Sequence, residues 1–152
     1  MHHNIIVVKV EPGPIAAVRV TTTFSDWPKQ FMKPLGMVYE AVNAGKIKQN
    51  GKNVMVYRPR GGDSVEIECG VQVATKFESI GEVVCSEIPG GRAATLVHIG
   101  PYGQLKASHL AVIEWSRKNG HRLAGVSWEI YGDWDDDPTK LRTDIFHLLE
   151  PS

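Results

Sequence analysis

A glutamate and a tyrosine lie two positions apart near the carboxyl end of this sequence, in residues 128–131 (WEIY). Alternate side chains of an extended strand point to one face, so Glu129 and Tyr131 share a face, and Trp128 and Ile130 share the other. An aromatic ring attracts a cation by about 0.5–2 kcal/mol. A carboxylate in an apolar wall adds an opposite charge at low effective dielectric. A receptor for an organic cation is therefore one interpretation of this pair.

A structural role is the alternative interpretation of this pair. Glu129 could pair with an arginine or lie on an exposed sheet face, and Tyr131 could pack its ring while its hydroxyl stays hydrated. A buried carboxylate without a partner has a raised pKa, and a cationic ligand would relieve that cost. The environment of Glu129 therefore decides between the two interpretations.

An internal repeat indicates how these side chains are positioned. Residues 12–17 (PGPIAA) match residues 89–94 (PGGRAA) at a shift of 77 positions, and residues 55–57 (MVY) resemble residues 129–131 (EIY) at a shift of 74. A shift near half the chain length indicates two copies of one unit. Ligand pockets tend to form where such units meet.

Each unit has the pattern strand, helix, strand, strand, over about residues 4–76 and 81–150. Apolar spacing predicts helices at residues 28–44 and 103–119. Alternation and turn residues predict strands at 4–10, 14–21, 53–58, 64–75, 81–88, 92–99, 126–132 and 141–149. We predict a single α+β domain over residues 1–152, with pseudo-two-fold symmetry. Its antiparallel sheet has about eight strands, or forms two abutting four-stranded halves, with two helices on one face.

Composition excludes several classes of protein. The 152 residues carry 17 Lys and Arg against 17 Asp and Glu, whereas a dedicated nucleic-acid binder normally has a basic excess. No stretch approaches the 18 apolar residues of a membrane span, and we expect a cytoplasmic protein. Two cysteines make no disulfide framework, and no zinc-ligand spacing occurs. We expect no metal, no cofactor and no direct contact with nucleic acid.

Five motifs occur in an order that suggests a family. They are residues 89–94 (PGGRAA), residues 98–102 (HIGPY), Trp115 followed by Gly120, residues 128–131 (WEIY), and residues 144–146 (DIF) after an acidic turn. This set resembles the GyrI-like small-molecule-binding domains. The family includes the effector-binding domains of AraC-type and MerR-type multidrug regulators and stand-alone gyrase-inhibitor-like proteins. The resemblance covers nearly the whole chain and implies the same duplicated fold.

The resemblance implies a central pocket for lipophilic, often cationic, compounds, lined by an acidic residue and aromatic rings. Glu129 is the residue that carries over as the pocket acid, together with Tyr131. His109 stands at a helix position that is usually aromatic in the family, which puts the size and the charge preference of the pocket in doubt. Tyr102, from the second of the five motifs, joins the candidate ligand-binding residues.

Three more residues complete the candidate set. Trp115 lies on the inner stripe of its helix, where core packing is the alternative role. Trp27 opens the first helix and could line the same groove from the other unit. Asp144 corresponds in position to Glu68 of the first unit, and both lie on the polar side of their strands, where a solvated face is the alternative.

We therefore expect a stand-alone binding protein for lipophilic, cationic compounds, acting in drug sensing or sequestration, because no helix-turn-helix segment accompanies the domain. One alternative is a GyrI-like hydrolase of reactive aromatic compounds, in which Glu129 and Tyr131 serve as general base and acid. Another is a gyrase-inhibitor-like interaction module with a protein partner. Exposed edge strands could also pair two chains into a homodimer.

Overall fold

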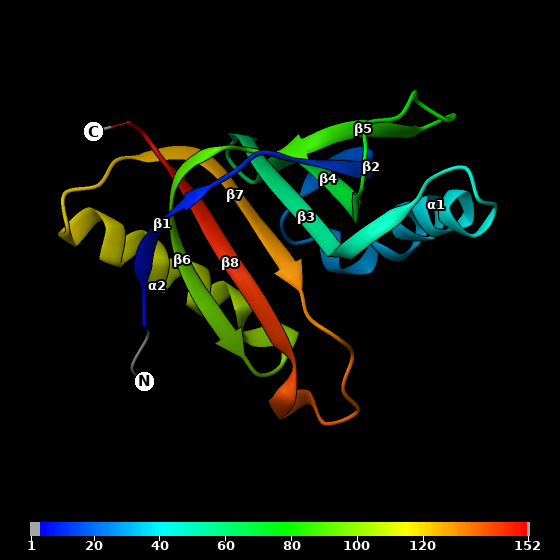
Figure 1. Cartoon of the computed structure of the whole chain (residues 1–152). Helices are drawn as coiled ribbons and strands as arrows, with labels where there is room; N and C mark the ends of the chain where they lie inside the picture. The colour runs from blue at the N-terminus through cyan, green and yellow to red at the C-terminus, as the bar shows by residue number, and fades with distance from the viewer. Residues whose placement is uncertain (1–3, 152) are drawn as a thin grey trace.

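The secondary structure of the chain is a run of strands interrupted by two helices (Figure 1). The computed structural model describes residues 4–151; residues 1–3 and 152, which the single-domain prediction also covers, lie outside the described residues. The strands are β1 (Ile6–Val10), β2 (Gly13–Thr23), β3 (Gln49–Gly61), β4 (Ser64–Val73), β5 (Val83–Ile88), β6 (Gly91–Ile99), β7 (Leu123–Tyr131) and β8 (Arg142–Leu149). The helices are α1 (Met32–Asn43) and α2 (Leu105–Lys118).

Each α-helix is preceded by a short 3₁₀ turn, at Trp27–Lys29 before α1 and at Tyr102–Gln104 before α2. The helix predicted over residues 28–44 is therefore divided into two pieces. Pro34 explains part of this, because a residue without an N–H is tolerated only in the first turn of a helix. Neither helix in the described part of the chain is long and apolar enough to cross a membrane.

The strands form one antiparallel sheet in the order β1-β6-β8-β7-β3-β4-β2-β5. Replacing each strand by its counterpart in the other unit (β1 by β5, β2 by β6, β3 by β7 and β4 by β8, and the reverse) gives the same order read from the opposite edge of the sheet. The predicted α+β architecture is confirmed, and the alternative of two separate half-sheets is excluded. The strand order has the symmetry that the sequence repeat predicts, and the duplication itself remains an inference from that repeat.

The first strand of each unit pairs with the other unit. β1 pairs with β6, and β5 pairs with β2, so each unit supplies the outermost strand of the opposite half. β3 and β7 meet at the centre and join the two halves. This central junction is where the pseudo-two-fold relation brings residues of both units together.

Both helices cover the same face of the sheet, α1 over the half made by β2 and β4, and α2 over the half made by β6 and β8 (Figure 1). Val38 and Ala41 of α1 pack on Ala16 and Val71. The two helices leave the central strands between them, and the side chains of β3 and β7 on this face form the candidate site.

The opposite face is also largely buried. Trp128 is fully buried there and stacks on Phe146 with ring centroids 5.3 Å apart. The solvated face considered for Glu68 is wrong, because this side chain is 1% exposed and accepts hydrogen bonds from Arg19 (3.0 Å) and Arg58. Residues from β2 and β6 belong to one apolar cluster on this side, so the sheet curls and encloses its own second face.

Candidate functional site

Glu129 lies at the centre of the sheet, on the face that carries the helices. It is opposite Met55 of β3 on one side and Ile145 of β8 on the other. Only 4% of the residue is exposed. A carboxylate in this position has lost its water and requires hydrogen-bond donors from the protein.

Three side chains supply those donors. Oε1 of Glu129 accepts a hydrogen bond from the hydroxyl of Tyr57 at 2.5 Å and another from the hydroxyl of Tyr131. Oε2 is 2.7 Å from Nε2 of His109, which projects from α2. Because an ionised carboxylate only accepts, this nitrogen of His109 is the donor. Glu129 therefore has partners on both oxygens, drawn from both units of the chain.

The hydrogen-bonded chain continues beyond His109. Its Nδ1 is 2.8 Å from Nε2 of His147 on β8, and the two rings meet edge to face. Burial lowers the pKa of His147 to about 3, and the neighbouring His109 adds to this effect. His147 is therefore a neutral imidazole at the end of a line that runs through His109 to Glu129.

The pKa values in the cluster follow from burial and these bonds. Burial alone would raise the pKa of Glu129, but the hydrogen bond and charge of His109 and the two tyrosine hydroxyls outweigh it and lower the net pKa. Burial and the Glu129 carboxylate raise the pKa of both Tyr57 and Tyr131 well above the ordinary value. Glu129 is thus ionised and both tyrosines are protonated at neutral pH. The raised pKa expected for an unpartnered carboxylate does not apply, since Glu129 is partnered.

Aromatic side chains surround this polar centre. Trp27 is buried and donates from Nε1 to the sulfur of Met55 at 3.3 Å, and the hydroxyl of Tyr131 lies at the same distance from that sulfur. The Tyr102 ring meets the Tyr131 ring edge to face at 5.7 Å and is 38% exposed. The structure therefore brings Trp27 and Tyr102 to the same cluster as Tyr131.

Two of the candidate residues lie elsewhere. Asp144 is opposite Ile130 on the other face of the sheet. There its Oδ1 accepts a hydrogen bond of 2.8 Å from Nε of Arg142. The alternation along β8 explains this, because Ile145, not Asp144, is the neighbour of Glu129. Trp115 packs against the core under α2 and stacks on His121 at 5.7 Å, away from the polar centre.

Tyr57 and His147 were missed by the sequence analysis. Tyr57 had a signal, since the repeat aligns residues 55–57 with residues 129–131 and so makes Tyr57 the counterpart of Tyr131. His147 had only the alternation of β8, which places it on the same face as Ile145. Pairing of β7 with β3 and with β8, not spacing along one strand, joins these residues to Glu129.

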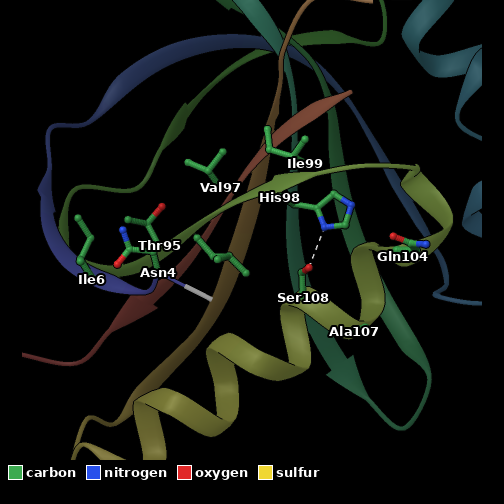
Figure 2. Close-up of a pocket in the computed structure, with 10 residues that line it drawn as sticks. Asn4, Ile6, Thr95, Val97, His98, Ile99, Gln104, Ala107 and Ser108 are labelled. Atoms are coloured by element: carbon green, nitrogen blue, oxygen red, sulfur yellow. Dashed lines mark hydrogen bonds between the residues drawn. The ribbon is translucent and has the colours of Figure 1, made fainter. Parts of the chain in front are cut away.

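Two surface hollows in the described part of the chain are lined mainly by residues outside the Glu129 cluster. One, of about 630 Å³, lies along the edge of β6 and includes Ile6, Val97, Ile99 and a buried hydrogen bond of 2.7 Å between His98 and Ser108 (Figure 2). The other, of about 250 Å³, is lined by Tyr39, Tyr131, Trp134, the first residues of β3 and the residues that follow β7. Tyr131 is thus common to this second hollow and to the Glu129 cluster.

No grouping of three potential metal ligands was found among residues 4–151. Both nitrogens of His109 and Nε2 of His147 already take part in hydrogen bonds within the cluster. Within the described residues the chemistry of the site is therefore that of hydrogen bonds, aromatic rings and one buried negative charge.

The strand order and the central carboxylate define the class: a two-helix, eight-stranded α+β domain with its polar centre at the pseudo-two-fold junction. The chain belongs to the family of the GyrI-like small molecule binding domain, whose sequence profile matches residues 3–149. The expected family is thereby confirmed. A comparison with curated proteins finds no match.

Solved structures share this fold at low sequence identity. The EcmrR C-terminal domain has a TM-score of 0.82 and 20% identity, with both chains covered in full. In a complex of EcmrR with DNA, the matching chain is covered over 58% of its length. SAV2435 bound to tetraphenylphosphonium has a TM-score of 0.70 at 11% identity, covering 99% of this chain and 94% of that one. A hydrolase from Listeria innocua has a TM-score of 0.59 at 10% identity, covering 96% and 91%.

Proposed function

We propose that this protein binds lipophilic organic cations at Glu129, as a receptor that senses or sequesters them. The observation that carries the proposal is a buried, ionised carboxylate ringed by aromatic side chains from both units. Such a charge interacts strongly with a cation because little water screens it. Ring faces add attraction for the same charge.

The second hollow supports a route to this carboxylate. Tyr131 lines that hollow and also bonds Glu129, so a ligand in contact with Tyr131 is one side chain away from the charge. The hollow holds about 250 Å³, below the roughly 300–1,000 Å³ of pockets for drug-sized ligands. We therefore propose that Tyr131 and Tyr102 move outward as a ligand enters. The tetraphenylphosphonium bound to SAV2435 supports this class of ligand by analogy of fold.

A hydrolase is the second candidate function. The line from Tyr131 through Glu129 and His109 to His147 connects groups that can accept and donate protons. In such a reaction Glu129 would take a proton from a water whose oxygen forms a bond to the substrate. A tyrosine hydroxyl would give its proton to the substrate atom whose bond breaks, and the proton on Glu129 would then restore the tyrosine. The lowered pKa of Glu129 makes it a weak base, which favours the receptor over the enzyme.

A cytoplasmic location also remains a proposal. Cys69 and Cys85 are both free thiols, and Cys69 is fully buried in the apolar cluster that also contains Trp27 and Met55. Free thiols in a folded domain support a reducing compartment.

The test is a titration with cationic, neutral and anionic aromatic dyes of matched size, followed by tryptophan quenching and dye emission. We expect saturable binding of the cationic dyes only. Mass spectrometry of each dye after incubation distinguishes the two candidates, because a receptor returns its ligand unchanged. A changed mass would make the hydrolase the better description, and equal binding of all three charge types would contradict the cation receptor.

A further inference from the structure

The carboxylate at the centre of the proposed site already has a potential cation beside it. Nε2 of His109 is 2.7 Å from Oε2 of Glu129, and a protonated imidazole at that distance forms an ion pair. His109 has 18% of its side chain exposed, so it lies between the buried charge and the surface. A ligand cation that approaches Glu129 therefore meets a site where a positive charge can already be present.

The bond between the two histidines allows His109 to lose that charge without losing a hydrogen bond. When His109 is protonated, its Nδ1–H donates to Nε2 of His147. When His109 is neutral with its proton on Nε2, it still donates to Glu129, and Nδ1 accepts from an Nε2–H of His147. Both states keep both bonds, and they differ by one proton.

Within the described chain, Glu129 is the one charged group among the buried titratable residues that face His109. Glu129 and Tyr131 face it from β7, Tyr57 from β3 with ring centroids 6.4 Å apart, and His147 from β8. On its own helix, Lys106 precedes it by three residues and is exposed. Of these, Glu129 carries the negative charge, both tyrosines are protonated, and His147 is neutral.

Resting on the proposed function, we propose that His109 determines the cation selectivity of the site, because ligand cation and imidazolium compete for the Glu129 carboxylate. Binding of a permanent organic cation then displaces one proton from the His109–His147 pair into solvent. A neutral ligand displaces none. The site takes up cations more tightly at alkaline pH than at acidic pH, and His109 sets this dependence.

The test is calorimetric titration with tetraphenylphosphonium, whose charge is permanent, so any released proton comes from the protein. Repeating each titration in buffers of different ionisation enthalpy gives the number of protons released. We expect release to approach about one proton per ligand at pH 5.5 and to vanish at pH 8.5, because only the imidazolium form of His109 competes with the ligand cation. The dissociation constant should be at least about tenfold larger at pH 5.5.

Substitutions assign the proton to its source. His109→Gln keeps an N–H that can donate to Glu129 but carries no charge, so we expect no proton release and a flat pH dependence. His121→Gln is the matched control, because His121 stacks on Trp115 and lies outside the cluster. It should leave the proton release unchanged.

The outcomes separate this inference from the proposed function. Cation binding without proton release at pH 5.5, or release that persists in folded His109→Gln, would contradict the role of His109 while leaving the receptor intact. Absence of binding at pH 8.5, where competition from His109 is weakest, would contradict the receptor and the inference together. Triphenylphosphine oxide, a neutral probe, should release no protons at any concentration tested; release with this probe would also count against the competition.

Discussion

At the scale of single residues, the fold depends on how one buried negative charge is satisfied. Both oxygens of Glu129 accept hydrogen bonds, and two of the three donors are tyrosines at equivalent places in the two units. Hydrogen bonds to a charged group contribute about 1.5–3 kcal/mol, and leaving such a group without a partner costs more. The cluster therefore stabilises the central junction as well as forming the proposed site.

Removal of one donor should be measurable as a loss of stability. In Tyr57→Phe the carboxylate keeps its other two donors but loses the bond of 2.5 Å. We expect the free energy of unfolding in urea to fall by about 1.5–3 kcal/mol. Tyr102→Phe is the control, since Tyr102 contacts the cluster through its ring and is partly exposed. An equal loss in both variants would contradict the assigned role of the Tyr57 hydroxyl.

His147 should give the protein a distinct dependence of stability on pH. Its pKa is about 3 in the folded protein against 6.5 for an ordinary imidazole, so the unfolded chain binds one more proton between these values. The contribution of neutral His147 to the free energy of unfolding is therefore complete above pH 6.5 and is lost progressively as pH falls toward 3. The slope is up to about 1.4 kcal/mol per pH unit.

Unfolding in urea across this pH range checks the assignment. The free energy of unfolding of His147→Gln should depend less steeply on pH. The difference corresponds to up to about one bound proton, whatever the absolute stability of the variant. His121→Gln serves again as the control, because His121 is partly exposed on the surface of the helix layer. A slope that is unchanged in His147→Gln would show that this imidazole does not titrate as its burial requires.

At the scale of elements, most of the strands and both helices could be predicted from the sequence. Alternation along residues 65–73 and turn residues around 61–63 predicted the β3–β4 hairpin, and the cores under both helices follow the predicted helix faces. The exchange of β1 and β5 between the halves could not be predicted, because alternation within a strand contains no information about its partner. The register between strands was equally unpredictable for the site, and it places Asp144 on the face opposite to Glu129.

Two glycines in different elements should respond in opposite ways to alanine. A Cβ on Gly70 of β4 would lie 1.7 Å from the carbonyl oxygen of Ala16, so the backbones of β2 and β4 would have to separate. A Cβ on Gly36 of α1 would meet nothing within 4 Å. We expect Gly70→Ala to destabilise by several kcal/mol and Gly36→Ala to stabilise by about 0.5–1 kcal/mol.

Thermal and urea unfolding of the two variants measure this contrast. The pair is informative because the chemical change is the same and the surroundings differ. A stable Gly70→Ala protein would mean that β2 and β4 do not approach as closely as their register implies.

At the scale of the whole molecule, the curled sheet separates two buried carboxylates. Glu68 lies on the enclosed face with Arg19 and Arg58, and Glu129 lies on the helix face with two tyrosines and a histidine. The partners of Glu68 are permanent cations, so its charge is already neutralised. Glu129 has neutral donors and one titratable donor, which leaves its charge available to a ligand. The sequence could identify Glu129 only through the family resemblance, because both glutamates alternate with apolar residues in the same way.

The affinity of tetraphenylphosphonium for the folded protein and for Glu129→Gln tests the cation receptor most directly. Measured at pH 8.5, where histidine competition is least, the substitution should weaken binding at least about tenfold, equivalent to about 1.4 kcal/mol. Glu68→Gln, which neutralises the other buried carboxylate, should bind as the unsubstituted protein does. Equal affinity of Glu129→Gln and the unsubstituted protein, with both shown to be folded, would contradict the assignment of Glu129 as the cation site.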